Sequence, residues 1–261
     1  MRAMNIASTG MLAQQTNVEV ISNNIANMNT TAYNRRRAEF TDLLYQNERR
    51  VGASSSDNNT IVPSGVQIGL GVKTTAVYRI TEQGSLTSTS NSLDLAMQGK
   101  GYFQVQLPSG ETAYTRDGSF QLSPAGQVVT HEGYTVLPGI TVPSNAVSVS
   151  VNASGQISVK LDGQVAQSVV GQLQVANFPN EAGLEARGDN LLMETTASGT
   201  AVVANPGSAG VGTVLQGFLE TSNVNVVSEI SNMISAQRAY EMNSKVIQTA
   251  DQMMSTVSQM R

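Results

Sequence analysis

Few side chains of this 261-residue sequence have the type or spacing that chemistry requires. The chain has no Cys, which excludes disulfide bonds, thiolate nucleophiles and metal sites with sulfur ligands. Its single His, His131, excludes metal sites with several His ligands. A Ser-His-Asp arrangement around His131 is compatible with the residue counts, but no Gly-x-Ser-x-Gly turn accompanies it. We therefore expect no catalytic residue, no metal and no cofactor, and we expect His131 to lie on a surface hairpin.

The glycine-rich segment at residues 65–74 does not have the spacing of a phosphate-binding loop. Gly69 and Gly71 lack the third Gly of a dinucleotide-binding fingerprint. Lys73 and Thr74 do not follow a Gly at the offset of a P-loop, and the segment alternates as a strand does. The segment therefore predicts a turn between two strands.

The charge balance argues against nucleic acid as a partner. The sequence has 15 Lys and Arg against 19 Asp and Glu, which gives a net charge of −4. A nucleic-acid-binding surface needs a basic field, and the cluster at Arg35, Arg36 and Arg37 is short enough for an ordinary solvated face. Charged residues make up 13% of the chain, about half the typical share, so the surface is polar but weakly charged.

The sequence shows no targeting or membrane segment. No stretch approaches the roughly 20 apolar residues that cross a bilayer, so we expect no membrane insertion. The first residues also lack the apolar core of a secretory signal, because Asn5, Thr9, Gln14 and Gln15 interrupt it. If the chain leaves the cytoplasm, we expect that it does so without a cleaved leader.

The elements that position the side chains fall into three zones. Both ends of the chain carry apolar residues at helical spacing and contain almost no Pro or Gly. The first zone, Met1 to Met28, predicts a helix of about 40 Å. Its apolar seam consists of Met4, Ala7, Met11, Val18, Ile21, Ile25 and Met28.

The last zone, from about Asn223 to Arg261, predicts a second long helix. One apolar stripe runs from Val226 to Val257, and a second, adjacent stripe runs from Ala239 to Met260. Two stripes on one helix predict that it packs against more than one neighbour.

The middle of the chain predicts an antiparallel β domain. Apolar and polar residues alternate at 66–68, 73–80, 102–107, 147–151 and 156–161. Turn signals such as Pro108-Ser109-Gly110 and Asp162-Gly163 separate these runs. Residues 47–59 have no period and predict a long loop or linker.

The two terminal helices either pack on the β domain or bind other copies of the chain. Their length, their wide Met-rich seams and a middle that can bury its own core favour the second interpretation. Long helices become stable when a partner covers their apolar stripe. The predicted assembly interface consists of the seam of the first helix with Val226, Ile230, Met233, Tyr240, Val246, Ile247, Met254 and Val257.

Motifs at both ends resemble the rod, hook and filament-associated axial proteins of the bacterial flagellum. The N-terminal motifs are Asn5–Met11 and Val20–Tyr33, and the C-terminal motifs are Gln216–Asn225 and Ile234–Lys245. In the middle, residues 93–103 and 114–120 are similar to motifs that rod and hook proteins share. Residues 171–174, 183–184 and 188–190 fit the distal rod members best, and the resemblance covers essentially the whole chain.

The resemblance implies a helical tube in which the terminal helices line the inside and the β domain faces outward. It also implies that residues 35–73 pack between the helical core and the β domain of adjacent subunits. The implied partners are other copies of the chain, proximal rod proteins, the hook protein, the surrounding P- and L-ring proteins and the flagellar type III export apparatus. The implied location is the rod of the flagellar basal body, where it crosses the periplasm.

We therefore expect an α+β fold, in which N- and C-terminal helices form a coiled-coil-like core domain and the central domain is antiparallel and β-rich. The expected parts are the N-terminal helix (1–34), an extended connecting segment (35–72), the β-rich outer domain (73–219) and the C-terminal helix (220–261). The predicted function is a non-enzymatic subunit of the distal rod that transmits torque from motor to hook. Alternatives are a proximal rod or hook paralogue and, from another class, a secreted hydrolase or carbohydrate-binding protein that uses His131 and the Asp117-Gly118 loop.

Overall fold

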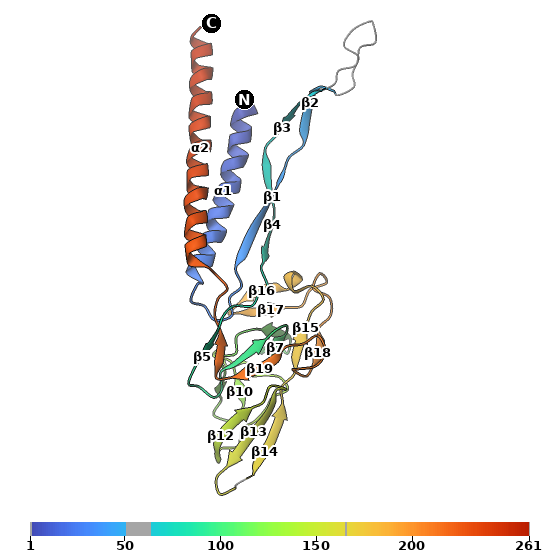
Figure 1. Ribbon diagram of the computed structural model, residues 1–261. Coiled ribbons are helices and arrows are strands. Elements are labelled where there is room, and N and C mark those ends of the chain that lie inside the picture. Colours follow the sequence, from blue (N-terminus) through green and yellow to red (C-terminus); the bar gives the residue numbers. More distant parts are fainter. Residues whose placement is uncertain (1, 51–63, 165, 261) are drawn as a thin grey trace. The chain divides into compact units, whose positions relative to one another are not determined.

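The computed structural model describes residues 2–50, 64–164 and 166–260 (Figure 1). The chain divides into two compact units. The helical unit comprises Met1–Ala26, Arg36–Arg79 and Asn225–Arg261, and the β unit comprises Asn27–Arg35 and Ile80–Val224. The loop predicted at residues 47–59 is wrong at residues 47–49, which belong to a strand, and its residues 51–59 lie outside the described residues. The fold is α+β, with one helix at each end and an antiparallel β-rich region between them, as the sequence predicted.

The two long helices are α1 (Arg2–Ala26, 25 residues) and α2 (Val226–Gln259, 34 residues). The side chain of Asn225 caps α2, because its Oδ1 accepts a hydrogen bond from the backbone N–H of Ser228. A turn follows α1 at once, and Ala32 has a φ of 56°. Met28 therefore lies beyond the end of α1, which corrects the prediction that the first helical seam reaches this residue.

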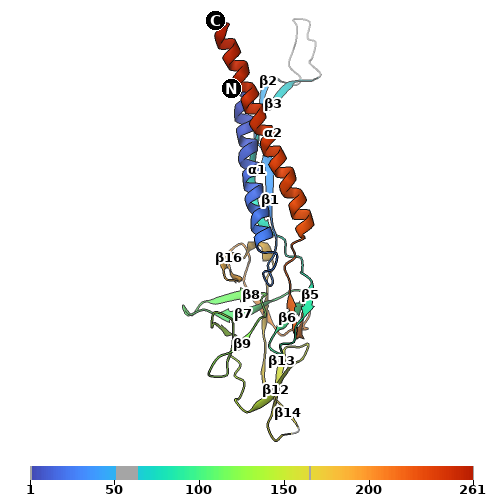
Figure 2. The same cartoon turned by 90° about the vertical axis from the view of Figure 1, so that its left-hand side faces the viewer.

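Within the helical unit, α1 packs against α2, and the start of α1 lies at the same end of the pair as the end of α2 (Figures 1 and 2). The helices approach each other closely at Gly10, where an added Cβ would lie 2.9 Å from Nδ2 of Asn243. A side chain at this position would require the amide of Asn243 to shift. Each helix is therefore already a packing partner of the other within one subunit.

A two-part β ribbon completes the helical unit. β1 (Arg36–Asp42) pairs with β4 (Val72–Arg79), and β2 (Tyr45–Arg49) pairs with β3 (Val66–Gly69), both antiparallel. α1 packs against β1 and β4, so α1 has a helix and a ribbon as neighbours. The structure thus groups residues 36–79 with the helices, where the sequence suggested a connecting segment at 35–72 and a β domain from residue 73.

The β unit contains all the remaining strands. Its nine-stranded sheet has the order β16-β17-β8-β7-β11-β10-β9, and β15 pairs with both β7 and β18. A three-stranded sheet has the order β12-β13-β14, and the pairs β19-β6 and β20-β5 complete the unit. The bounds are β5 Leu86–Ser88, β6 Leu95–Gln98, β7 Tyr102–Gln106, β8 Thr112–Thr115, β9 Gln121–Leu122, β10 Val128–Val129, β11 Thr135–Val136, β12 Ala146–Val151, β13 Gln156–Leu161, β14 Gln167–Gln172, β15 Val175–Asn177, η1 (a short 3-10 helix) Glu181–Gly183, β16 Glu185–Gly188, β17 Leu191–Met193, β18 Val202–Ala204, β19 Thr213–Gln216 and β20 Phe218–Glu220.

The core of the β unit forms around β7. Phe103 is fully buried and meets Phe120 edge to face, with ring centroids 5.2 Å apart. A second cluster surrounds Phe178, which makes edge-to-face contacts with Tyr102 and Tyr114. Edge-to-face contacts of this kind add about 0.5–1.5 kcal/mol each beyond area burial. The β unit therefore buries a core of its own.

The alternating runs of the sequence are strands in the structure. The runs at 66–68 and 73–80 are β3 and β4, and those at 102–107, 147–151 and 156–161 are β7, β12 and β13. The sequence reasoning missed β1, because its charged residues hide the alternation. It also missed β14 and the short strands of the nine-stranded sheet, which are too brief to show a period.

Candidate functional site

The predicted assembly interface lies on the faces of α1 and α2, and the structure sorts its residues by exposure. Ala7 and Ile21 are buried inside the helical unit. Met4, Met11, Val18, Ile25, Val226, Met233 and Ile247 are partly buried. Met28, Ile230, Tyr240, Val246, Met254 and Val257 are exposed. Only the exposed residues, and the exposed parts of the partly buried ones, remain available to another molecule.

The residues that α2 buries most deeply are small or charged. They are Glu229, Ala236 and Ala250, which are separated by multiples of seven residues. Sequence reasoning left Glu229 and Ala236 out because it followed large apolar side chains. The heptad spacing of these positions was visible in the sequence, but small and polar residues alone do not indicate a buried line.

The outer face of α2 carries large apolar side chains without cover in the described chain. Ile230 is 47% exposed, and Met242 and Val257 are each 66% exposed. The full set of exposed large apolar residues on α2 is Val227, Ile230, Ile234, Tyr240, Met242, Val246, Met253, Met254 and Val257. Large apolar side chains exposed in this number on one helix indicate a surface for protein interaction.

A buried polar cluster joins the C-terminal end of α1 to the start of β1 and the start of α2. The amide of Asn24, only 1% exposed, donates from Nδ2 to the carbonyl oxygen of Arg36 at 2.8 Å and to Oε2 of Glu229 at 3.2 Å. Its Oδ1 accepts from the backbone N–H of Arg36 at 2.8 Å. One side chain thus joins α1 to the first residue of β1 and to the first turn of α2, where a carboxylate is favourable.

A second point joins α1 to the ribbon. Thr9 Oγ1 donates to the carbonyl of Ile6 and lies 3.4 Å from the backbone N of Val72, beside Gly71. Gly71 has a φ of 118°, and a Cβ there would collide with Thr9 Oγ1. Between these two points a groove of about 520 Å³ runs along α1 and β4, with Leu12 exposed in it.

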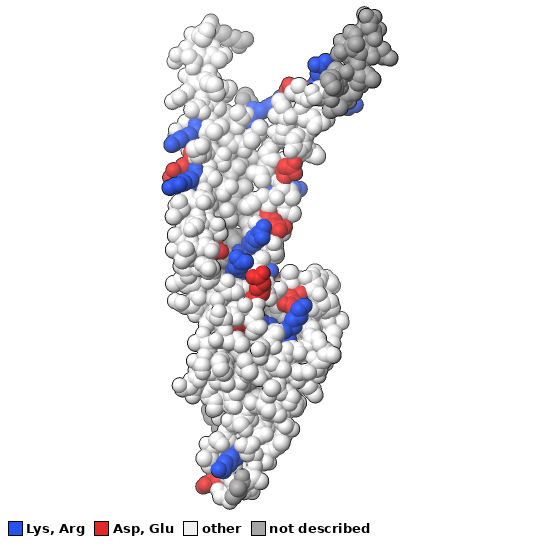
Figure 3. Space-filling view, in the orientation of Figure 1, with Lys and Arg blue, Asp and Glu red and all other residues white. Residues whose placement is uncertain are grey.

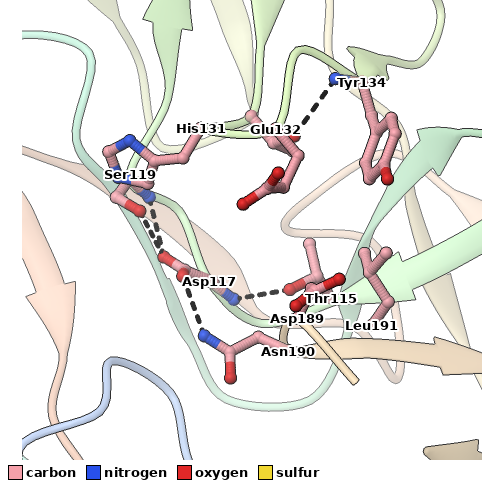
Figure 4. Close-up of a pocket in the computed structure, with 10 residues that line it drawn as sticks. Thr115, Asp117, Ser119, His131, Glu132, Tyr134, Asp189, Asn190 and Leu191 are labelled. Atoms are coloured by element: carbon pink, nitrogen blue, oxygen red, sulfur yellow. Dashed lines mark hydrogen bonds between the residues drawn. The ribbon is translucent and has the colours of Figure 1, made fainter. Parts of the chain in front are cut away.

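The residues of the alternative hydrolase hypothesis meet in a small hollow of the β unit, of about 160 Å³ (Figure 4). Asp117 accepts hydrogen bonds from the backbone N–H and the hydroxyl of Ser119, at 3.0 and 2.6 Å, and from Asn190 at 3.1 Å. Nδ1 of His131 lies 3.1 Å from Nε2 of Gln121. In the described chain no hydrogen bond joins His131 to Ser119 or Asp117, so the three side chains do not form a nucleophilic relay.

A buried ion pair stabilises the β unit near this hollow. Nε of Arg116 lies 2.9 Å from Oε2 of Glu220, and both side chains are less than 10% exposed. The other guanidinium nitrogens donate to the carbonyl oxygens of Gly101 and Gly99, while Glu220 Oε1 accepts from the N–H of Gly84. The motifs at residues 93–103 and 114–120 are therefore joined by one buried arginine, each of whose three side-chain nitrogens donates a hydrogen bond.

Neither a metal site nor a membrane span is found in the described ranges. No group of three His, Asp or Glu side chains is placed there to hold a metal ion. None of the described helices combines the length and hydropathy of a membrane-spanning segment.

Comparison with known proteins accounts for both ends and the centre of the chain. Residues 4–33 match the family described as "Flagella basal body rod protein", and residues 215–260 match "Flagellar basal body rod FlgEFG protein C-terminal". Residues 96–159 match "Flagellar hook protein FlgE/F/G D1 domain".

Three relatives that align over nearly their whole length are all named flagellar basal-body rod protein FlgG. The chain is 60% identical over 261 residues to the flagellar basal-body rod protein FlgG of Caulobacter vibrioides, and the alignment covers 100% of both chains. It is 53% identical to FlgG of Agrobacterium fabrum over 99% of this chain and 98% of the relative. It is 45% identical to FlgG of Borreliella burgdorferi over 100% of this chain and 99% of the relative. This chain belongs to the FlgG family of flagellar basal-body rod proteins.

The family decides the class of function. The chain is a structural rod subunit that assembles with other copies into the flagellar basal-body rod, and it is not an enzyme. The polar hollow around His131 is therefore not an active site. The exposed apolar face of α2 is the feature of the structure that fits an assembling subunit best.

Proposed function

We propose that this chain is the subunit of the distal rod, and that its copies polymerise head to tail into a stiff helical tube that transmits torque from motor to hook. A repeated contact that does not close into a ring produces such a filament. The observation that carries the proposal is the row of exposed apolar side chains on α2, in a chain that matches FlgG proteins over its full length.

In the proposed tube, α1 and α2 form a coiled-coil-like core near the axis, and the β unit faces outward. The buried heptad positions of α2 support this arrangement. The exposed seam residues Ile230, Tyr240, Val246, Met254 and Val257 contact neighbouring copies. Fully burying one such apolar side chain contributes about 1.5–3 kcal/mol, so a few of them per subunit outweigh any single surface ion pair.

The ribbon is proposed to contact neighbouring copies as well. Every residue of β2 is exposed, and Leu44 and Tyr45 present large apolar side chains to solvent. A two-stranded hairpin is only marginally stable by itself, so a neighbour that covers β2 and β3 would stabilise it. The family resemblance implies a related contact, in which residues 35–73 pack between the helical core and the β domain of adjacent subunits.

We also propose which proteins neighbour the subunit in the basal body. Its neighbours along the axis would be proximal rod proteins and the hook protein, and the P- and L-ring proteins would surround it. The chain would reach the periplasmic part of the basal body through the flagellar type III export apparatus.

Electron microscopy of purified basal bodies tests the proposal. Ile230→Asp places a carboxylate on the exposed face of α2, and we expect it to abolish rod assembly and motility while the β unit stays folded. Ile21→Asp and Ile247→Asp should also abolish rod assembly. Because Ile21 is buried, Ile21→Asp would in addition disrupt the packing of α1 on α2. Ser231→Asp, which adds the same group without removing an apolar side chain, is the matched control. Normal rods in the Ile230→Asp strain would contradict the proposed interface.

A place in the proximal rod is the second candidate, because the family matched at residues 96–159 covers several axial proteins, FlgE, FlgF and FlgG. Labelled electron microscopy that locates the subunit along the basal body separates the two. A label at the hook, or at the end of the rod nearest the membrane ring, would contradict the distal position.

A further inference from the structure

Four methionines of the chain are exposed on α2 and at its C-terminal cap. Met242 is 66% exposed, Met253 62%, Met254 41% and the cap residue Met260 85%. Met97, by contrast, lies in the core of the β unit and is fully buried. The thioethers of these four residues, named here the exposed α2 methionines, can therefore be reached by small dissolved molecules in the free subunit.

The last part of α2 receives no cover from the rest of the described subunit. Every residue from 251 to 260 is exposed, and three of these ten residues are Met. The hydrogen bonds recorded for this segment, such as that from Oγ1 of Thr256 to the carbonyl oxygen of Gln252, stay within the helix. A chemical change to these side chains therefore disturbs no packing inside the subunit, but it alters the surface that another copy would cover.

This end of α2 also carries very little charge. Beyond Lys245 the described part of the helix contains one charged residue, Asp251, and the end of the helix presents an uncharged surface in the view of Figure 3. A neighbouring copy can bury an apolar thioether here without removing a polar group from water. A sulfoxide in the same place carries a polar S–O bond, and burying such a group without a hydrogen bond is unfavourable.

Sulfur chemistry in this chain is restricted to methionine. The sequence has eleven Met and no Cys, so no thiol competes for an oxidant. The buried thioether of Met97 is shielded for as long as the β unit stays folded. Oxidation of the folded, free subunit is therefore directed to its exposed methionines, of which α2 and its cap carry four.

We propose that Met242, Met253, Met254 and Met260 form an oxidation site that controls whether the free subunit can assemble. The oxidant is a hydroperoxide such as hydrogen peroxide. A lone pair of the sulfur attacks one peroxide oxygen, the S–O bond forms as the O–O bond breaks, and the departing hydroxide takes up the proton of the transferred oxygen and leaves as water. The sulfur loses two electrons and the peroxide gains them.

The resulting sulfoxide is reversible, because methionine sulfoxide reductases return it to the thioether. Oxidised subunits therefore stay outside the polymer until they are reduced, and subunits already in the polymer are protected because a neighbour covers the sulfur atoms. The inference rests on the proposed polymer, since assembly is the step that oxidation blocks.

Peroxide treatment of the purified full chain tests the chemical part. We expect mass spectrometry of its peptides to show one added oxygen atom on each exposed α2 methionine well before Met97 reacts. The helical circular-dichroism signal should stay unchanged, because the oxidised side chains pack against nothing inside the subunit. Oxidation of Met97 at the same rate, or loss of the helical signal, would overturn the site.

Assembly is tested in cells whose only copy of the chain has Leu at all four positions. Leu keeps the apolar character and the helix propensity of Met but has no sulfur. After peroxide treatment during rod growth, we expect the unsubstituted strain to form about tenfold fewer complete rods than the four-Leu strain. Met28→Leu, at an exposed methionine of the β unit, is the matched control and should remain as sensitive as the unsubstituted strain. Equal losses in the unsubstituted and four-Leu strains, or a four-Leu chain that forms no rods without peroxide, would overturn the proposal.

Gln at the same four positions gives a measurement that needs no peroxide. Its amide is polar and of similar length to the oxidised side chain, and Gln is a good helix former. We expect this variant to keep its helical signal and to form about tenfold fewer rods. Normal rods in the four-Gln strain overturn the oxidation site alone, whereas an unsubstituted chain that is absent from rods contradicts the proposed function itself.

Discussion

Replacement of Asn24 by Ala should destabilise the helical unit more than any other single polar substitution in it. The change removes an amide that is 1% exposed and that makes three hydrogen bonds. It leaves the N–H and carbonyl of Arg36 without their partner, and it leaves the carboxylate of Glu229, 5% exposed, beside a small cavity. No neighbouring side chain replaces the lost amide in the described structure.

The expected loss of stability follows from the polar groups that lose their hydrogen bonds to Asn24. A buried polar group without its hydrogen bond costs about 1–3 kcal/mol, and a charged group costs more. With the N–H and the carbonyl of Arg36 and the carboxylate of Glu229 affected, we expect the free energy of unfolding of the helical unit to fall by about 3–5 kcal/mol. Asn24→Asp should be at least as harmful at neutral pH, because it places a second carboxylate against Glu229 and keeps only the acceptor for the N–H of Arg36.

The measurement is urea unfolding of the purified full chain, followed by the helical circular-dichroism signal. Ser22→Ala, on the exposed side of α1, is the matched control and should change the free energy of unfolding by less than about 0.5 kcal/mol. A fall of less than about 1 kcal/mol for Asn24→Ala would refute the reasoning, because it would mean that water satisfies the groups as well as the amide does.

Two further predictions concern the β unit. Arg116→Met should lower the free energy of unfolding of the β unit by about 3–5 kcal/mol, because it leaves the buried Glu220 carboxylate without its cation. An unchanged urea midpoint of the β-strand circular-dichroism signal would contradict this prediction. Burial, together with the adjacent Glu194 carboxylate, raises the pKa of the Tyr114 hydroxyl above its ordinary value of about 10. A raised pKa means that the neutral hydroxyl is favoured in the folded state, so its contribution is complete below pH 10 and is lost as the pH rises through the folded pKa. Tyr114→Phe should therefore make stability less dependent on pH in the alkaline range, and identical alkaline profiles would refute the assignment.

The long elements were predictable because their apolar pattern repeats over many residues. The apolar stripes at both ends predicted two helices, and the alternation around residues 102–107 and 156–161 predicted central strands, all of which the structure confirms. Helix ends were less certain, and Met28 shows why. Its apolar side chain continues the stripe, but the backbone leaves the helix after Ala26.

The grouping of the ribbon with the helices was not predictable from the sequence. Strand β1 begins with two arginines and alternates poorly, so only its pairing with β4 shows that it is a strand. The pairing joins residues that are 30 to 43 positions apart, which a local pattern cannot report. The same holds for the ion pair of Arg116 with Glu220, whose partners are 104 residues apart.

The sequence by itself determined the class of this protein: two amphipathic helices around a β domain, without thiols or clustered metal ligands, and with motifs typical of flagellar axial proteins. Tertiary structure decided which parts of the amphipathic faces stay exposed. The line buried on α2 consists of Glu229, Ala236 and Ala250, while Ile230 and Met242 face solvent. The physical reason is that periodicity marks an apolar face, but exposure depends on how closely a neighbour approaches, and two helices approach most closely where their side chains are small.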